Sequence, residues 1–86
     1  MLVVSVDLGY GWEYLFGIII DEQEWDFGST GTTDKRRADR LDKERADLFC
    51  NIVENNQWGT RWVYCGEGSL PLSDFDPRVA YRLEQV

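Results

Sequence analysis

The sequence predicts an α+β fold, in which one helix packs across a small antiparallel or mixed sheet of four or five strands, in the order β-β-(β)-α-β-(β). Three observations lead to this fold class. Glycine turns divide the first part of the chain into short apolar segments. The middle part has apolar residues three and four positions apart, and the last part returns to short β-branched and aromatic runs.

The first two strands are predicted at residues 2–8 and 13–20, antiparallel and joined by the turn Gly9-Tyr10-Gly11. In the first strand, apolar residues alternate with polar ones, which predicts one face on a core and the other exposed. The continuous apolar run at residues 16–20 indicates that both faces of the second strand are covered and that it lies centrally.

An acidic turn at residues 21–24 leads into a short third strand at residues 25–27. Residues 28–33 have the glycine, serine and threonine composition of a loop. Thr33 or Asp34 then offers an N-cap for a helix that continues to about Asn55.

That helix is predicted from an apolar stripe and from opposite charges four residues apart, each pair contributing a few tenths of a kcal/mol, roughly. Arg45 falls on the stripe, where we expect it either at the edge of the core or at the point where the helix leaves the sheet. Another strand is expected within residues 58–65, followed by a turn-rich loop at residues 66–77. The pattern of residues 79–83 favours a last strand, with a short helix after Pro77 as the alternative.

Composition indicates one folded domain, residues 1–86, since 43% of the residues are hydrophobic and 14% are aromatic. The formal net charge is −7, and it is unevenly distributed. Residues 1–33 contain six acidic residues and no lysine or arginine, whereas the charges nearly balance after residue 33. A field of one sign would repel nucleic acid and anionic membranes and attract a basic protein surface.

Several functional classes lack the residues that they need. Histidine is absent, and Cys50 and Cys65 do not have the spacing of a zinc site. We therefore expect no catalytic residues, no metal ligands and no cofactor. The sequence shows no signal peptide and no apolar stretch of about 20 residues. The expected location is the cytoplasm with two free thiols, and a Cys50–Cys65 disulfide is the alternative.

The segment Val6-Asp7-Leu8-Gly9-Tyr10-Gly11 resembles the first phosphate loop of actin-like ATPases, especially plasmid-segregation filament proteins, and residues 26–33 loosely resemble the second loop. The resemblance implies that Asp7 and Gly9 face nucleotide phosphates and a metal ion. It covers about fifteen residues, and in that family the two loops belong to separate subdomains of a far longer chain. A nucleotide- or phosphate-binding fragment is accordingly the second alternative function.

The function that the residues favour most is binding to a basic surface of another protein through the acidic, aromatic N-terminal hairpin. About half of the four tryptophans are expected in the core, and Trp12 and Trp25 are expected to be the exposed ones. Aromatic anchors among carboxylates would combine burial with charge complementarity. The candidate partner-binding residues are Tyr10, Trp12, Glu13, Asp21, Glu22, Glu24, Trp25 and Asp26.

Large basic surfaces are commonly nucleic-acid-binding grooves, so the sharper hypothesis is an inhibitor of a nuclease or nucleic-acid-binding effector. Bacterial immunity proteins, anti-restriction proteins and phage anti-CRISPR proteins resemble this chain in size and charge. The first alternative is a structural or assembly subunit, such as a homodimer that pairs through an edge strand or the helix face containing Phe49.

Overall fold

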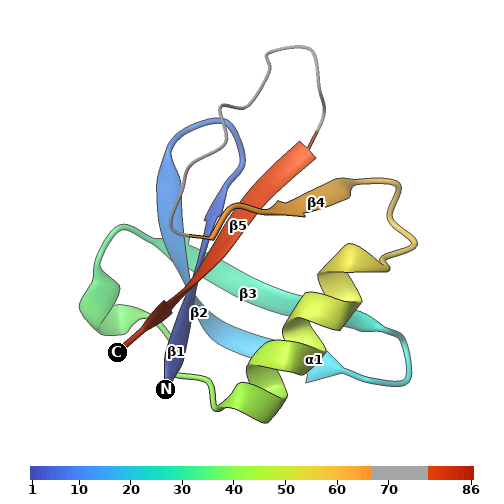
Figure 1. Cartoon of the computed structure of the whole chain (residues 1–86), viewed down its shortest axis with the longest axis horizontal. Helices are drawn as coiled ribbons and strands as arrows, with labels where there is room; N and C mark the ends of the chain where they lie inside the picture. The colour runs from blue at the N-terminus through green and yellow to red at the C-terminus, as the bar shows by residue number, and fades with distance from the viewer. Residues whose placement is uncertain (67–77) are drawn as a thin grey trace.

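The computed structural model describes residues 1–66 and 78–86, and these residues form one mixed sheet with one α-helix (Figure 1). The strand order is β3-β2-β1-β5-β4. All neighbours are antiparallel except β4 and β5, which are parallel. The predicted α+β fold class is confirmed. The elements are β1 (Leu2–Asp7), β2 (Trp12–Asp21), β3 (Asp26–Thr32), the 3-10 helix η1 (Lys35–Arg37), α1 (Lys43–Glu54), β4 (Arg61–Tyr64) and β5 (Arg78–Gln85).

β1 is the central strand, and both of its faces are buried. Val4 and Val6 belong to the core under α1, while Ser5, which points the opposite way, has no exposed surface. The prediction of one exposed face was therefore wrong, whereas β2, which was predicted to lie centrally, is an internal strand between β1 and β3. Leu8 lies beyond the end of the strand and is exposed.

A β-bulge in β2 decides which of its apolar residues reach the core. The register with β3 shifts between Phe16 and Ile19, and Gly17 has a φ of 62° within the shift. Leu15 and Ile18 are three residues apart, yet both are buried in the core under α1. Because side chains in a regular strand alternate, the extra residue is what puts both on one face. Ile19 then points outward and is 73% exposed, so the expectation that both faces of β2 are covered was wrong there.

The segment before α1 fills a gap that opens between β1 and β2. Leu2 and Leu41 exchange two backbone hydrogen bonds of 2.7 Å, in an isolated antiparallel bridge. Asp39 donates its backbone N–H to the Leu15 carbonyl, and its carboxylate accepts the N–H of Ile18 at 2.7 Å. These contacts give partners to backbone groups that the bulge would otherwise leave without any.

These contacts interrupt the helix that was predicted from residue 33 or 34 to residue 55. Asp34 caps the short η1, and a second cap, Asp42, begins α1 by accepting the N–H of Arg45. Charge pairs four residues apart contribute only a few tenths of a kcal/mol each, roughly, so backbone pairing and the burial of Leu41 prevail at residues 38–42. Arg45, expected at the edge of the core, is exposed.

β3 is longer than predicted, because residues 28–32 continue the strand instead of forming a loop. Pairing with β2 extends along β3 from Asp26 to Thr32. A Cβ at Gly31 would meet only the end of the exposed Glu13 side chain, which can move aside, so glycine is not required for packing here. Composition alone therefore misidentified this strand as a loop.

The remaining elements follow the predictions more closely. β5 confirms the last strand and extends it by a few residues, which excludes the short helix after Pro77. β4 occupies only the middle of the predicted segment. Of the predicted loop at residues 66–77, residues 67–77 lie outside the described part of the chain.

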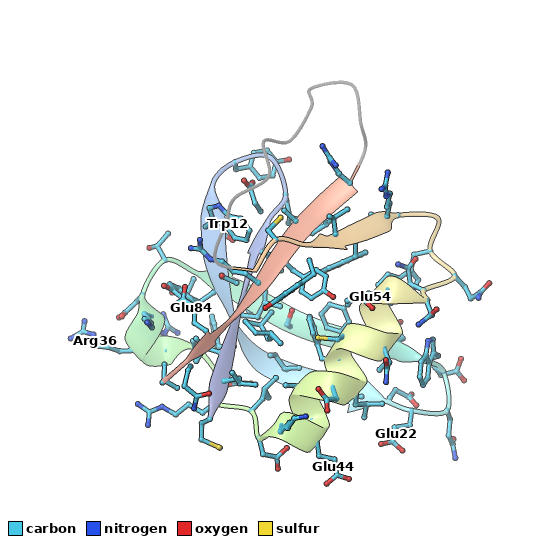
Figure 2. All side chains as sticks on the ribbon, in the orientation of Figure 1. Trp12, Glu22, Arg36, Glu44, Glu54 and Glu84 are labelled. Atoms are coloured by element: carbon cyan, nitrogen blue, oxygen red, sulfur yellow. The ribbon has the colours of Figure 1, made fainter. Side chains whose placement is uncertain are left out.

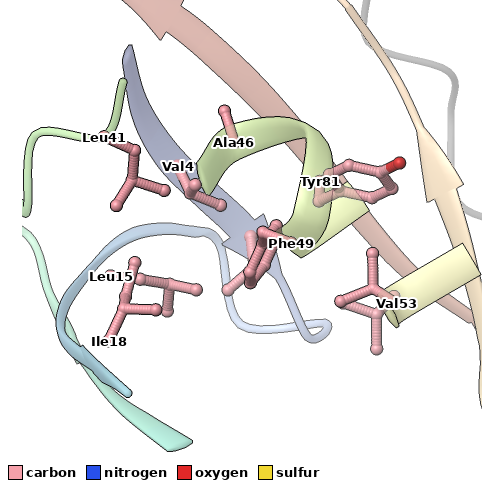
Figure 3. Packing of buried hydrophobic residues seen from close by; sticks show 10 residues of the cluster. Val4, Leu15, Ile18, Leu41, Ala46, Phe49, Val53 and Tyr81 are labelled. Carbon is pink, nitrogen blue, oxygen red and sulfur yellow. The ribbon is translucent and has the colours of Figure 1, made fainter. Parts of the chain in front are cut away.

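The two faces of the sheet are covered differently. Under α1, Phe49 has no exposed surface and packs among aliphatic residues of β1 and β2 and against Tyr81 of β5 (Figure 3). On the opposite face Arg82 lies over the Trp12 ring at 4.2 Å and donates to Ser5 Oγ at 3.0 Å. Lys35 of η1 pairs there with Glu84 at 2.9 Å. We call these the helix face and the charged face.

Candidate functional site

The turn between β2 and β3 concentrates acidic residues in a defined conformation. One carboxylate oxygen of Asp21 accepts the backbone N–H groups of Gln23 and Glu24, at 3.0 and 3.1 Å. Trp25 has a φ of 53°, a left-handed conformation that is rare outside glycine. Asp21 is therefore part of the turn's own hydrogen bonding, whereas Glu22 and Glu24 are exposed.

An exposed isoleucine lies beside these carboxylates. Ile19 lines a surface depression of about 450 Å³ together with Asp21, Glu24, Asp26, Phe27 and Gly28. An apolar side chain that is 73% exposed and bordered by three carboxylates resembles the apolar centre and polar rim of a protein interface. We call Ile19, Asp21, Glu22, Glu24 and Asp26 the tip surface.

The acidic surface continues onto α1. Glu22 lines a second depression, of about 320 Å³, with Glu44, Asp47 and Leu48 of the helix. Figure 2 shows Glu22 and Glu44 on the same side of the molecule. Arg45 is also part of this lining, so one cation stands among three carboxylates. Glu44 and Asp47 were not among the predicted residues, because their segment is neutral overall in the sequence.

The structure divides the predicted binding residues into two groups. Asp21, Glu22, Glu24, Trp25 and Asp26 lie together at the β2–β3 turn, whereas Tyr10, Trp12 and Glu13 lie at the other end of β2. The ten residues of β2 separate the two ends by roughly 30 Å. Tyr10 is 92% exposed, and Trp12 is half-buried beneath Arg82. One compact patch cannot include both groups.

Tryptophan burial also differs from the expectation. Trp12, Trp25 and Trp62 are half-buried, and Trp58 is 39% exposed, so none belongs wholly to the core. Trp58, Trp62 and Phe27 instead contact one another beside the tip surface. Sequence reasoning missed this cluster because its members come from three separate segments with no common motif.

The glycine-rich segments form a turn and part of a strand. The Asp7 carboxylate accepts the N–H groups of Gly9 and Gly11, at 2.7 and 3.3 Å, and so closes its own turn. Gly28 and Gly31 lie within β3. Within residues 1–66 and 78–86, no group of three or more cysteine, aspartate or glutamate side chains could hold a metal ion.

Both cysteines are free thiols, and burial raises the pKa of the half-buried Cys50 above its usual value. In the described part of the chain, no helix has the length and apolar character needed to cross a bilayer.

The fold and surface thus define a small mixed-sheet α+β protein whose tip surface is acidic around one exposed isoleucine. Comparisons with protein-family models, curated proteins and solved structures found no match.

Proposed function

We propose that the protein acts by binding, rather than by catalysis, and that its tip surface docks on a basic surface of another protein. The observation that carries this proposal is Ile19, which is 73% exposed between Asp21, Glu24 and Asp26. The negative charges of the carboxylates speed the encounter with a cationic partner, and burial of the isoleucine helps to stabilise the complex. The turn's own hydrogen bonds reduce the entropy lost on docking.

The finer proposal concerns the partner's identity. A basic surface large enough to receive the tip and the neighbouring acids of α1 is typical of a nucleic-acid-binding groove. The protein would then inhibit a nuclease or effector by occupying that groove, in the manner of an immunity, anti-restriction or anti-CRISPR protein that mimics nucleic acid. Its net charge of −7 disfavours direct binding to nucleic acid or to anionic membranes, and its free thiols suit the cytoplasm.

Charge reversal at the tip tests this proposal. Glu24→Lys leaves the Asp21 contacts of the turn in place, so the fold should persist while partner affinity falls at least about tenfold near 0.1 M salt. Glu13→Lys makes the same charge change at the opposite end of β2 and serves as the matched control. Both variants and the wild type are used to capture partners from a host lysate, and the affinity of the identified partner is then measured.

Competition completes this experiment. Duplex DNA should displace the wild-type protein from its partner, and the difference between wild type and Glu24→Lys should shrink as salt rises. The proposal fails if both charge reversals weaken binding equally, since that result would mean that the partner responds to the net negative charge and not to the tip surface. If the partner stays bound in the presence of excess duplex DNA, the protein does not occupy the partner's nucleic-acid-binding groove.

Trp25 lies in the same turn, between Glu24 and Asp26 of the tip surface, and offers a second test. Its left-handed φ of 53° is one that glycine adopts readily, so Trp25→Gly removes the indole without opposing the turn. If Trp25 anchors the partner, affinity should fall by about tenfold or more, which corresponds to an aromatic interface anchor. Unchanged affinity with unchanged thermal stability would show that this indole takes no part.

Self-assembly is a second candidate function, favoured by the outer edge of β3, which pairs with no other strand in the described part of the chain. This seven-residue strand lies at one edge of the sheet and contains no lysine or proline to block a further strand. A second copy pairing there would extend the sheet. Sedimentation at increasing concentration decides between the candidates, because a constant monomer mass excludes pairing, whereas a dimer abolished by Ser29→Lys supports it.

A further inference from the structure

Beside the tip surface, three aromatic side chains and one carboxylate line a shallow depression of about 330 Å³. Phe27 and Asp26 come from β3, Trp62 from β4, and Trp58 from the loop between α1 and β4. Trp58 is 39% exposed, and Asp26 and Phe27 also line the depression around Ile19. We call these four residues the aromatic depression.

The rings in the aromatic depression are packed against one another and against the core. Their centroids are 5.7 Å apart for Phe27–Trp58, 5.9 Å for Phe27–Trp62 and 6.3 Å for Trp58–Trp62. Phe27 also meets the buried Phe49 ring at 4.9 Å. Rings this close leave no gap for a ligand between them, so a ligand must lie over them.

The side-chain amide of Asn56 holds the loop that carries Trp58 through three hydrogen bonds. Asn56 donates from its side chain to the carbonyls of Val53 and Thr60, at 2.6 and 2.8 Å, and its Oδ1 accepts the backbone N–H of Trp58 at 3.0 Å. These hydrogen bonds join the end of α1 to the start of β4. The exposed indole is therefore presented by an ordered loop, which lowers the entropy cost of binding over it.

We propose that the aromatic depression binds a cationic side chain, preferably an arginine, of the basic partner, with Asp26 as its counter-ion. The proposal rests on the proposed function and names a contact within it. Indole faces attract cations through their quadrupole, and the flat, weakly hydrated guanidinium group stacks on them more readily than an ammonium group does. The Asp26 carboxylate would repel the phosphate that accompanies a nucleic-acid base. A purely apolar occupant would bury this charge without a cation beside it, although one of its oxygens accepts the Phe27 N–H.

The test uses a short peptide as the probe. The acetylated and amidated tripeptide Gly-Arg-Gly is titrated into the full chain, and Gly-citrulline-Gly serves as the neutral probe of almost the same shape. The four indole N–H signals in a nitrogen–proton correlation spectrum report the position of binding. We expect saturable shifts at Trp58 and Trp62 with small shifts at Trp12, and an affinity for the citrulline peptide at least about fivefold lower.

Two variants separate the charge from the rings. Asp26→Asn keeps an oxygen that can accept the Phe27 N–H, and it should weaken the arginine peptide about fivefold without changing citrulline binding. Asp34→Asn removes the same charge beyond the other end of β3 and should leave both affinities unchanged. Trp58→Leu keeps an apolar side chain without the π face, and it should abolish the preference for arginine over citrulline.

Several results would overturn the proposal. Equal binding of the two peptides would make the depression an apolar contact, and equal shifts at all four indoles would mean non-specific attraction. Neither result bears on the Glu24→Lys experiment, which uses the whole partner. If the arginine peptide binds as expected while Glu24→Lys retains full partner affinity, the proposed docking through the tip fails and the arginine site stands.

Discussion

The two faces of the sheet reach burial by different means. On the helix face, Phe49 and Tyr81 are fully buried among aliphatic and aromatic side chains. On the charged face, Arg82 bridges Trp12, Ser5 and Glu84, and Lys35 joins Glu84 to η1. The stabilising free energy from apolar burial grows with the area removed from water. Partly exposed ion pairs add little to the stability of the fold, and their contribution weakens with salt.

This difference indicates separate roles for the two faces. The helix face supplies most of the free energy of folding, and the charged face orients η1 and covers the polar side of β1. Substitutions on the helix face should therefore affect the stability of the whole fold. Those on the charged face should have small, salt-dependent effects.

The largest effect is expected for Phe49→Ala. Removing a fully buried phenyl ring at the centre of the helix face should lower the free energy of unfolding by about 3–5 kcal/mol, because it loses both transfer energy and packing. Denaturant unfolding followed by tryptophan fluorescence measures the change. A loss below about 1 kcal/mol would mean that the helix face does not dominate stability.

Asp39→Ala should have the next largest effect. Its carboxylate accepts the Ile18 N–H at 2.7 Å, and without it that donor in the bulge has no protein partner, at a cost of about 1–3 kcal/mol. Asp39→Asn keeps an acceptor and should cost less. Hydrogen exchange at the Ile18 amide should speed up in the alanine variant, and unchanged protection would contradict this account of the bulge.

Alkaline pH should destabilise the protein through the helix face. Burial, reinforced by the hydrogen bond that its hydroxyl donates to Glu54, raises the pKa of Tyr81 far above its ordinary value of 10.0. The unfolded chain therefore releases this proton first, so the stabilisation is complete below pH 10 and falls as the pH rises further, by at most about 1.4 kcal/mol per pH unit. Stability curves from pH 8 to 12 should be flatter for Tyr81→Phe than for wild type.

The smallest effects are expected on the charged face. Arg82→Met should cost about 1 kcal/mol, because Ser5 loses a hydrogen-bond donor and Trp12 loses its cation. Lys35→Met removes a more exposed pair with Glu84 and should cost less than about 1 kcal/mol. Both losses should shrink in 1 M salt. A loss of 3 kcal/mol or more for either variant would mean that the charged face contributes as much to stability as the helix face.

Much of the fold and part of the candidate site were predictable from local patterns. Alternation and glycine turns indicated the β1–β2 hairpin, and the apolar spacing of Phe49, Ile52 and Val53 indicated α1. The acidic turn at residues 21–24 was evident from composition. Exposure of Ile19 was not predicted, because the apolar run was taken as a regular strand. The glycine at position 17 is the signal that could have indicated the bulge that turns this side chain outward.

The sequence by itself determined the types of β1, β2, α1, β4 and β5, the position of the acidic turn and the imbalance of charge, because each depends on neighbours within a few residues. Only the tertiary structure decided that residues 39–41 leave the helix to pair with β1 and β2, and that Phe27, Trp58 and Trp62 meet. These outcomes depend on strand pairing between distant segments. Backbone hydrogen bonds and ring packing across such pairs outweigh the few tenths of a kcal/mol, roughly, that local helix-favouring charge pairs provide.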